Sequence, residues 1–253
     1  NPIEGCQPCS PGCERCWARK WAQRAQHNPA FHLSGGTFPG NNPYITIAKW
    51  DGHLCEFSNR WDEPLLWRKP QRIFVGSRSD IALWPETAIA RVIDHSLRRM
   101  DHRFLWLTKR PAMLANKLGR LAVPTNTAVG VTVCNQAEAD AKLPQLLSIP
   151  GAWLWVSIEP MLGPVGFHGN RLEWLAPFKD YDPMLCPTPR LSWVVVGGES
   201  GSDARPMQPE WARSLRYQCQ DSGVALFVKQ MSAGVEIPAD LNIKEYPHAL
   251  RIE

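Results

Sequence analysis

The feature that most constrains the fold is a series of short apolar segments that recurs along most of the chain. Each is rich in β-branched or aromatic residues, and the six of them cover residues 72–76, 103–108, 128–133, 153–158, 193–197 and 225–228. Near-continuous apolar runs of this length are typical of strands in a parallel sheet that is covered on both faces. We therefore expect a core of six parallel strands.

Amphipathic segments separate several of these strands. Residues 85–100 begin with a proline and repeat apolar residues at helical spacing, and residues 112–121, 136–147 and 210–221 show similar patterns. Alternation of strands and helices predicts right-handed β/α crossovers. Six strands are fewer than the eight of a full barrel. The expected fold is therefore α/β, either a partial (β/α)6 TIM-like barrel or a doubly wound sheet.

The length of 253 residues suits a single domain for an α/β chain. Within it, residues 1–26 hold a cysteine-rich segment, 27–70 an irregular insertion, 71–230 the β/α core and 231–253 a tail. A second loop-rich stretch, 162–189, interrupts the core. Long irregular insertions in compact domains usually form lids or substrate-facing loops.

The net charge of +4 permits a polyanionic partner such as nucleic acid but does not by itself indicate one. No apolar run approaches the roughly 20 residues of a membrane span, and no signal-peptide pattern opens the chain. We expect no membrane partner and a cytoplasmic location. Because the first residue is Asn1 rather than Met, we also expect the natural chain to be longer.

Four of the eight cysteines, Cys6, Cys9, Cys13 and Cys16, fall close together near the N-terminus. Clustered cysteines in a chain that can bury its own core indicate metal ligands. An iron–sulfur cluster could use Cys9, Cys13 and Cys16, or Cys6, Cys13 and Cys16. Three thiolates leave one iron of a cubane open to a further ligand. Tetrahedral zinc is the main alternative, although these cysteines are spaced more closely than in a zinc ribbon.

Polar residues also follow the predicted strands, at the rim where β/α folds build their sites. Those of interest are Ser77, Ser79, Asp80, Lys109, Cys134, Glu159, Gly198 and Glu199. Each alone could be a solvated loop residue, so their coincidence at one rim is the stronger indication.

Longer motifs cover almost the whole chain: NPIEGC, SPGCERCWA, PLLWRKPQRIFVGSRSD, HRFLWLTKRP, AVGVTV, VSIEPMLGPV, WVVVGGESGSDARPMQPEW and ALFVKQ. With these motifs the chain resembles a phage-associated family of three-cysteine, radical S-adenosylmethionine (SAM)-like proteins long catalogued as of unknown function. Its opening is also similar, more distantly, to spore photoproduct lyase, whose motif has the form NPYxGCxxGCxYCYA.

The resemblance implies a 4Fe-4S cluster held by Cys6, Cys13 and Cys16, with Cys9 as a bystander or alternative ligand. It implies a partial barrel of the radical SAM type, in which Trp17 packs near the adenine of SAM. By position in such a barrel, a larger group contacts SAM or substrate: Ser77, Ser79, Asp80, Lys109, Glu159, Gly198 and Glu199. The alternative for Glu159 and Glu199 is a salt bridge at the barrel mouth with Lys109 or Arg205.

Cys134 stands where the family commonly has an acidic residue. A thiol at that strand end could return a hydrogen atom to a substrate radical, as a cysteine does in photoproduct lyases. The alternative is a buried cysteine that behaves as a small hydrophobic residue.

The expected function is that of a radical SAM enzyme that modifies or rearranges a nucleic-acid base, with phage DNA and thymine hypermodification as the first guess. An electron donor such as flavodoxin or ferredoxin would be required. Basic and aromatic residues of the insertion could contact DNA: Arg60, Trp61, Trp67, Arg68 and Lys69. The alternatives are a non-catalytic nucleic-acid-binding module with a structural Fe-S or zinc site, and a SAM-dependent methyltransferase.

Overall fold

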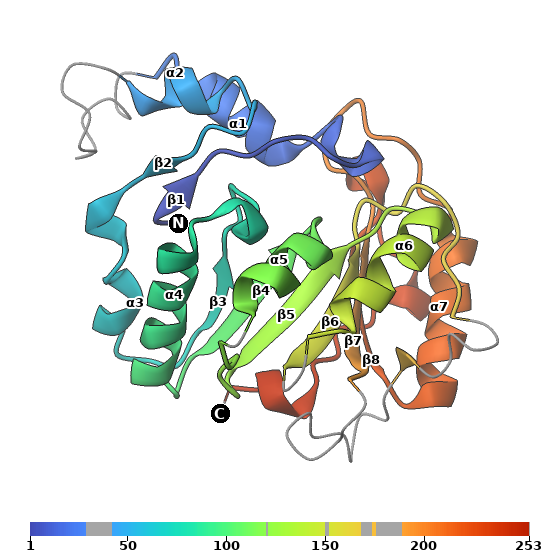
Figure 1. The fold of residues 1–253 in the computed structure, drawn as a ribbon. Helices are drawn as coiled ribbons and strands as arrows, with labels where there is room; N and C mark the ends of the chain where they lie inside the picture. Colours follow the sequence, from blue (N-terminus) through green and yellow to red (C-terminus); the bar gives the residue numbers. More distant parts are fainter. Residues whose placement is uncertain (29–41, 120, 150–151, 168–173, 176–188, 253) are drawn as a thin grey trace.

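The computed structural model describes residues 1–252 except 29–41, 120, 150–151, 168–173 and 176–188. Its core is a six-stranded parallel sheet with the order β3-β4-β5-β6-β7-β8 (Figure 1). The strands are β3 (Arg72–Val75), β4 (Arg103–Thr108), β5 (Thr127–Thr132), β6 (Trp153–Ile158), β7 (Leu191–Gly197) and β8 (Ala225–Gln230). Neighbours in the sheet are also neighbours in the sequence, so the sheet curls as a half-barrel and the doubly wound alternative is wrong.

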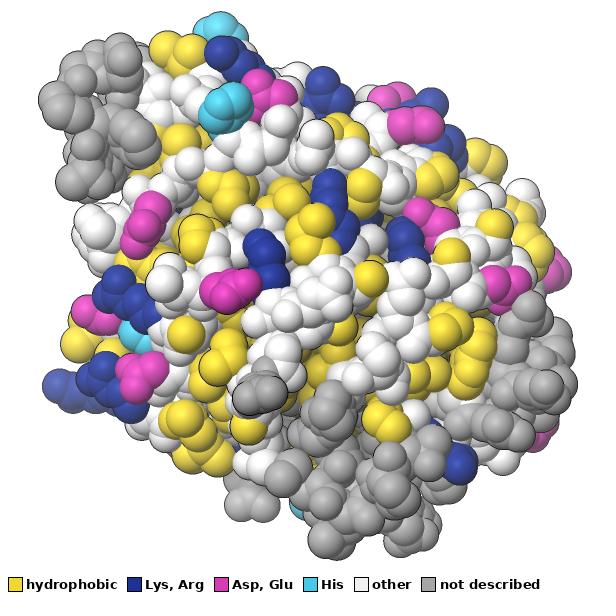
Figure 2. All heavy atoms as spheres, viewed as in Figure 1, with side chains coloured by type: hydrophobic (Ala, Val, Ile, Leu, Met, Phe, Trp, Pro, Cys, Tyr) yellow, Lys and Arg dark blue, Asp and Glu magenta, His cyan; other side chains and the backbone are white. Residues whose placement is uncertain are grey.

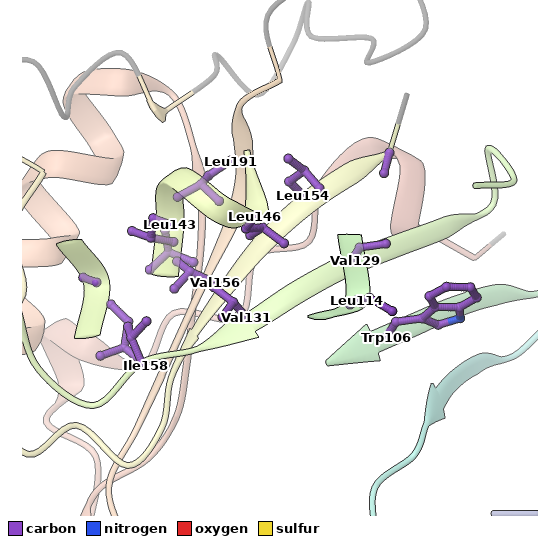
Figure 3. Packing of buried hydrophobic residues seen from close by; sticks show 14 of the residues in the cluster. Trp106, Leu114, Val129, Val131, Leu143, Leu146, Leu154, Val156, Ile158 and Leu191 are labelled. Carbon is purple, nitrogen blue, oxygen red and sulfur yellow. The ribbon is translucent and has the colours of Figure 1, made fainter. Parts of the chain in front are cut away.

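Four helices cover one face of this sheet: α4 (Glu86–Arg98), α5 (Pro111–Leu118), α6 (Gln136–Leu146) and α7 (Pro209–Ser222). Right-handed crossovers between consecutive strands place every connecting helix on the same side. Figure 3 shows the resulting contact, in which Val156 of β6 and Val131 of β5 lie close to Leu143 and Leu146 of α6, and Val129 lies beside Leu114 of α5. This main core leaves the opposite, concave face of the sheet free of the four helices.

The concave face has its own smaller core, which mixes aromatic and small residues. Trp155 and Trp193 lie on adjacent strands with ring centroids 5.2 Å apart. The indole of Trp155 fits because Gly130 stands opposite it on β5, where a Cβ atom would lie only 2.3 Å from the indole. Gly130 therefore allows an aromatic side chain to lie across the inside of the half-barrel.

The N-terminal segment forms a cap on the end of the sheet to which the strands point (Figure 1). The short strand β1 (Ile3–Glu4) pairs with β2 (Cys55–Glu56), and α1 (Trp17–Ala25) packs on α2 (Pro43–Ile47). A separate hydrophobic core joins them through Ala18, Ala22, Tyr44, Ile47, Trp50 and Phe57. Much of the insertion predicted to be irregular is thus a packed part of this cap, and it also contains α3 (Glu63–Leu66).

The C-terminal tail crosses the concave side of the sheet and contacts both of its edge strands. Lys244 forms an antiparallel bridge with Phe227 of β8, and Arg72 of β3 donates a hydrogen bond from Nε to the Leu250 carbonyl at 2.8 Å. Between these points Tyr246 packs on Trp193, with ring centroids 5.4 Å apart. The tail therefore covers part of the concave face, on the side away from the N-terminal cap.

The four predicted helices are confirmed to within a few residues, and Gly223 ends α7 with φ of +64°, as its position indicated. Within the described residues, no helix has the length and apolarity needed to span a bilayer. Figure 2 shows that acidic and basic side chains are interspersed on the side of the molecule seen in Figure 1. Among the described residues, this side therefore has no continuous basic area.

Candidate functional site

A cavity of about 450 Å³ lies between the concave face and the N-terminal cap. Its volume falls within the roughly 300–1,000 Å³ typical of small-molecule sites. The cysteine segment and the polar strand ends form its upper part, and aromatic residues form its lower part: Phe74, Trp155, Trp193, Phe227 and Tyr246. The predicted rim and the predicted cysteine segment therefore meet at one cavity.

The cysteine segment is held in a short 3-10 helix, Pro11–Cys13, whose N-terminus is capped by the Ser10 hydroxyl accepting from the Gly12 amide at 3.2 Å. Gly12 is required by close packing, because a Cβ atom there would lie 2.6 Å from Cys134 Sγ and 2.9 Å from Pro160. This packing fixes the loop against the ends of β5 and β6.

Three of the four clustered cysteines line the cavity, namely Cys6, Cys13 and Cys16. Cys9 is exposed and is not among the lining residues. This difference favours the ligand set that the resemblance implied over the set containing Cys9. Cys55 and Cys219, by contrast, are buried in hydrophobic cores.

No three histidine, cysteine or acidic side chains in the described ranges converge as ligands of a single metal ion. A cubane binds its three thiolates through three different irons, so its ligands need not converge on one point. Three thiols that face one cavity, with room beside them, fit the donor set of such a cluster.

The surroundings of the cysteines favour a thiolate at Cys13 and a neutral thiol at Cys6. A hydrogen bond from Cys9 lowers the pKa of the Cys13 thiol to about 5, whereas burial and the charge of Asp80 raise the pKa of Cys6 to about 11. Lys109 lies half-buried in the same cavity. Burial lowers the pKa of Lys109, but negative charge on Cys13, Cys16, Asp80 and Cys134 together raises it by more. Lys109 is therefore a cation placed beside the cysteine sulfurs.

Asp80 lines the cavity, but its carboxylate already has four hydrogen bonds within the protein. The donors are the Thr108 hydroxyl at 2.6 Å, the Arg110 guanidinium at 2.9 Å, and the Lys109 and Ala82 amides at 3.0 Å. This carboxylate joins the loops after β3 and β4, and its four hydrogen bonds serve the structure.

Ser77 and Ser79 also line the cavity and tie the N-terminal segment to β3. Ser77 Oγ accepts a hydrogen bond from the Asn1 side chain at 2.8 Å, and Ser79 Oγ donates to the Ile3 carbonyl at 3.1 Å. Ser79 Oγ also accepts from the Trp84 indole at 2.8 Å. Direct contact of these hydroxyls with SAM stays a prediction.

Glu159 and Glu199 both form salt bridges at the mouth of the cavity. Glu159 accepts from Lys229 Nζ at 2.7 Å, and Glu199 accepts from the Arg205 guanidinium and its backbone amide, the latter at 2.8 Å. Glu199 is thus paired with Arg205, as the salt-bridge alternative predicted. The partner of Glu159 is Lys229 rather than Lys109 or Arg205.

Gly198 and Trp17 are both cavity residues, but they differ in what surrounds them. A Cβ atom at Gly198 would lie 2.4 Å from the Ser232 amide nitrogen, so the glycine is explained by packing against the chain after β8. Trp17 is 51% exposed and lies at the start of α1, directly after Cys16. Its ring is therefore available to a ligand at the cavity edge.

Cys134 is fully buried and is not among the residues that line the cavity. Its Sγ lies 3.5 Å from the Ser10 hydroxyl and packs under Gly12. The sequence predicted that the Cys134 thiol faces the site. In the structure this thiol packs against Ser10 and Gly12 of the cysteine loop. Its position favours the alternative of a structural thiol.

Two residues of the predicted DNA contact surface are internal. Trp61 is 4% exposed and donates from Nε1 to Glu56, and Arg60 forms an ion pair with the buried Glu4 while stacking on Phe57. Neither side chain is available to phosphate or base, because both are used within the cap. Trp67, Arg68 and Lys69 are exposed.

The aromatic lower part of the cavity was missed by sequence reasoning, which treated Trp155, Trp193 and Phe227 only as strand residues. A buried strand carries apolar residues toward both faces, so the pattern does not say which face is filled by helices. Gly130 within an apolar strand was the available signal, since glycine in a strand often marks close approach by another group.

The fold and the cavity define an α/β half-barrel protein with a cysteine-lined site at the carboxyl ends of its strands. Residues 1–242 match the family model described as "Protein of unknown function (DUF5131)". Because the match covers nearly the whole chain, the protein belongs to this family. No curated protein and no solved structure matches it.

Proposed function

We propose that this protein is a radical SAM enzyme that binds a 4Fe-4S cluster through Cys6, Cys13 and Cys16. The observation that carries the proposal is that these three cysteines face one cavity with the polar strand ends, while Cys9 does not. When bound, the cluster would supply the electron that cleaves the sulfonium of SAM and generates a carbon radical.

The residues of the chain would hold the reactants in place. Lys109, beside Cys13 and Cys16, would offset the negative charge of the thiolates or bind the SAM carboxylate. Trp17 would cover the adenine from the open side of the cavity. Glu159 and Glu199, held by Lys229 and Arg205, are carboxylates with fixed orientation at the mouth.

For the substrate we propose a nucleic-acid base, in DNA as the first candidate. The aromatic lining of the cavity supports a planar ring, and exposed Trp67, Arg68 and Lys69 remain available for contact with a strand. An external one-electron donor, such as flavodoxin or ferredoxin, would complete the reaction.

Anaerobic reconstitution with iron and sulfide tests the proposal. We expect about four irons and four sulfides per chain, and formation of 5′-deoxyadenosine from SAM when dithionite is added. Metal binding that leaves SAM intact would instead identify a structural site, and bound zinc would exclude the cluster. S-adenosylhomocysteine as the product would identify a methyltransferase.

Two matched variants sharpen this test. Cys16→Ala should abolish cluster formation, whereas Cys9→Ala should retain it, since Cys16 lines the cavity and Cys9 does not. Cys219→Ala, remote in the main core, controls for the loss of a thiol elsewhere. Loss of the cluster in Cys9→Ala with retention in Cys6→Ala would assign the first ligand to Cys9.

A further inference from the structure

Thr132 and Ser157 are two largely buried residues whose hydroxyls lie on the cavity wall rather than enclosed in the core. Thr132 is 1% exposed and Ser157 is 2% exposed, and both line the cavity. In the part of the chain that the structure describes, neither hydroxyl takes part in a hydrogen bond. A hydroxyl on a cavity wall can donate a hydrogen bond to a ligand in the cavity and accept one from it.

The two hydroxyls are neighbours by the register of the sheet. Thr132 on β5 is the Cα partner of Ser157 on β6, and adjacent strands lie roughly 4.8 Å apart. Each hydroxyl can donate one hydrogen bond and accept others. Together they offer an adjacent pair of donor and acceptor sites on one wall of the cavity.

An aromatic floor lies two residues below this pair, toward the start of each strand. Gly130 and Trp155 are paired there, and Trp155 is followed along the sheet by Trp193. Trp193 packs on Trp155 and Tyr246 at centroid distances of 5.2 and 5.4 Å. There is space above this floor because the next inward-facing residues, two positions further along β5, β6 and β7, have smaller side chains: Thr132, Ser157 and Val195.

From this arrangement we propose that Thr132 and Ser157 bind the polar edge of a nucleobase-sized heterocycle that lies against the Trp155–Trp193 floor. The adjacent hydroxyls match adjacent donor and acceptor atoms on a ring edge, and the indoles match its flat face. The charged pair Glu159–Lys229 lies further up, at the strand ends, so the ring itself would be uncharged. As a substrate site this inference rests on the proposed function.

The ring could belong to the substrate or to the adenine of SAM, since both have the same chemistry. The test measures binding of thymidine, adenosine and SAM to the full chain by ligand-observed NMR and equilibrium dialysis, with 2-deoxyribose 5-phosphate as the probe that lacks the heterocyclic ring of a base. The measurement is made both as isolated and after reconstitution. It needs neither cleavage of SAM nor a reductant, so its outcome is independent of the deoxyadenosine assay.

We expect at least one ring-containing probe to bind and the sugar phosphate not to bind. Thr132→Val and Ser157→Ala should each weaken that binding by about fivefold, the effect of one hydrogen bond. Thymidine binding without competition by SAM would assign the site to the substrate, and competition between them would assign it to the adenine.

Thr127→Val is the matched control, because Thr127 lies at the other end of β5, is fully buried, has an unpartnered hydroxyl and does not line the cavity. It should leave the affinity unchanged. The proposal is overturned if no ring-containing probe binds, or if Thr132→Val and Thr127→Val change the affinity equally. Thermal melting of each variant separates loss of binding from loss of folding.

Discussion

The fit between Gly130 and Trp155 makes a quantitative prediction about stability. In Gly130→Ala, the new Cβ would lie 2.3 Å from the indole of Trp155, more than 1 Å inside the 3.4 Å at which ordinary contacts begin. Trp155 has little freedom to move away, because it packs on Trp193 and meets Phe74 edge to face. Overpacking of this kind costs about 1–3 kcal/mol. Urea unfolding should show this loss, and each kcal/mol should lower Tm by roughly 2–4 °C.

Two further variants establish the cause. Gly163→Ala is the matched control, since its Cβ would make only an ordinary contact of 3.7 Å with Asn135, and it should change the free energy of unfolding little. Trp155→Leu removes the group with which the new methyl collides, so the double variant should lose less than the two single losses combined. If Gly130→Ala costs no more than Gly163→Ala, or if the losses simply add, the close approach described here is incorrect.

The remaining predictions concern three polar contacts around the cavity. Asp80→Asn should lower the free energy of unfolding by about 3 kcal/mol in urea titrations, because an amide cannot replace a carboxylate that faces Arg110 and three further donors. Burial raises the pKa of Glu199, but the hydrogen bonds from Arg205 lower it by more, so that it lies below its ordinary value of 4.5. Glu199→Gln should therefore lower the free energy of unfolding by its full amount above about pH 5. This loss should shrink as the pH falls through the folded-state pKa. Arg72→Ala should lower stability by about 1 kcal/mol and speed proteolysis of the C-terminal tail, because Arg72 contacts both the Leu250 carbonyl and the Tyr246 ring.

The regular part of the fold could be predicted because each strand and helix carries its own signal. The strand over 103–108 and the strand over 153–158 have the bounds that their apolar runs indicated. The pairing of β1 with β2 could not be predicted, since strands of two residues show no alternation. The course of the C-terminal tail across the sheet was also missed, because it depends on contacts such as Tyr246 with Trp193 that are distant in sequence.

The candidate site shows what can and cannot be predicted from polar residues at strand ends. The structure brings Cys6, Cys13 and Cys16, the set that the resemblance implied, to one cavity with the strand ends. Sequence reasoning could not distinguish a polar group that is free to bind from one that the protein already uses, because that depends on every donor nearby. Asp80 is the clearest case, as its acceptor sites are occupied by loop and strand-end groups.

The polar groups that remain open to a ligand, the hydroxyls of Thr132 and Ser157, lie within the strands, where the sequence predicted only core residues. In a half-barrel the inward residues alternate with those under the helices, so a hydroxyl inside an apolar run points either into packed side chains or into the cavity. Thr127 and Thr132, on one strand, represent the two outcomes. The Thr127 hydroxyl is enclosed in the core, whereas the Thr132 hydroxyl lies on the cavity wall, where a ligand can reach it. The difference in affinity between their valine variants therefore measures what a hydroxyl on the cavity wall contributes to recognition.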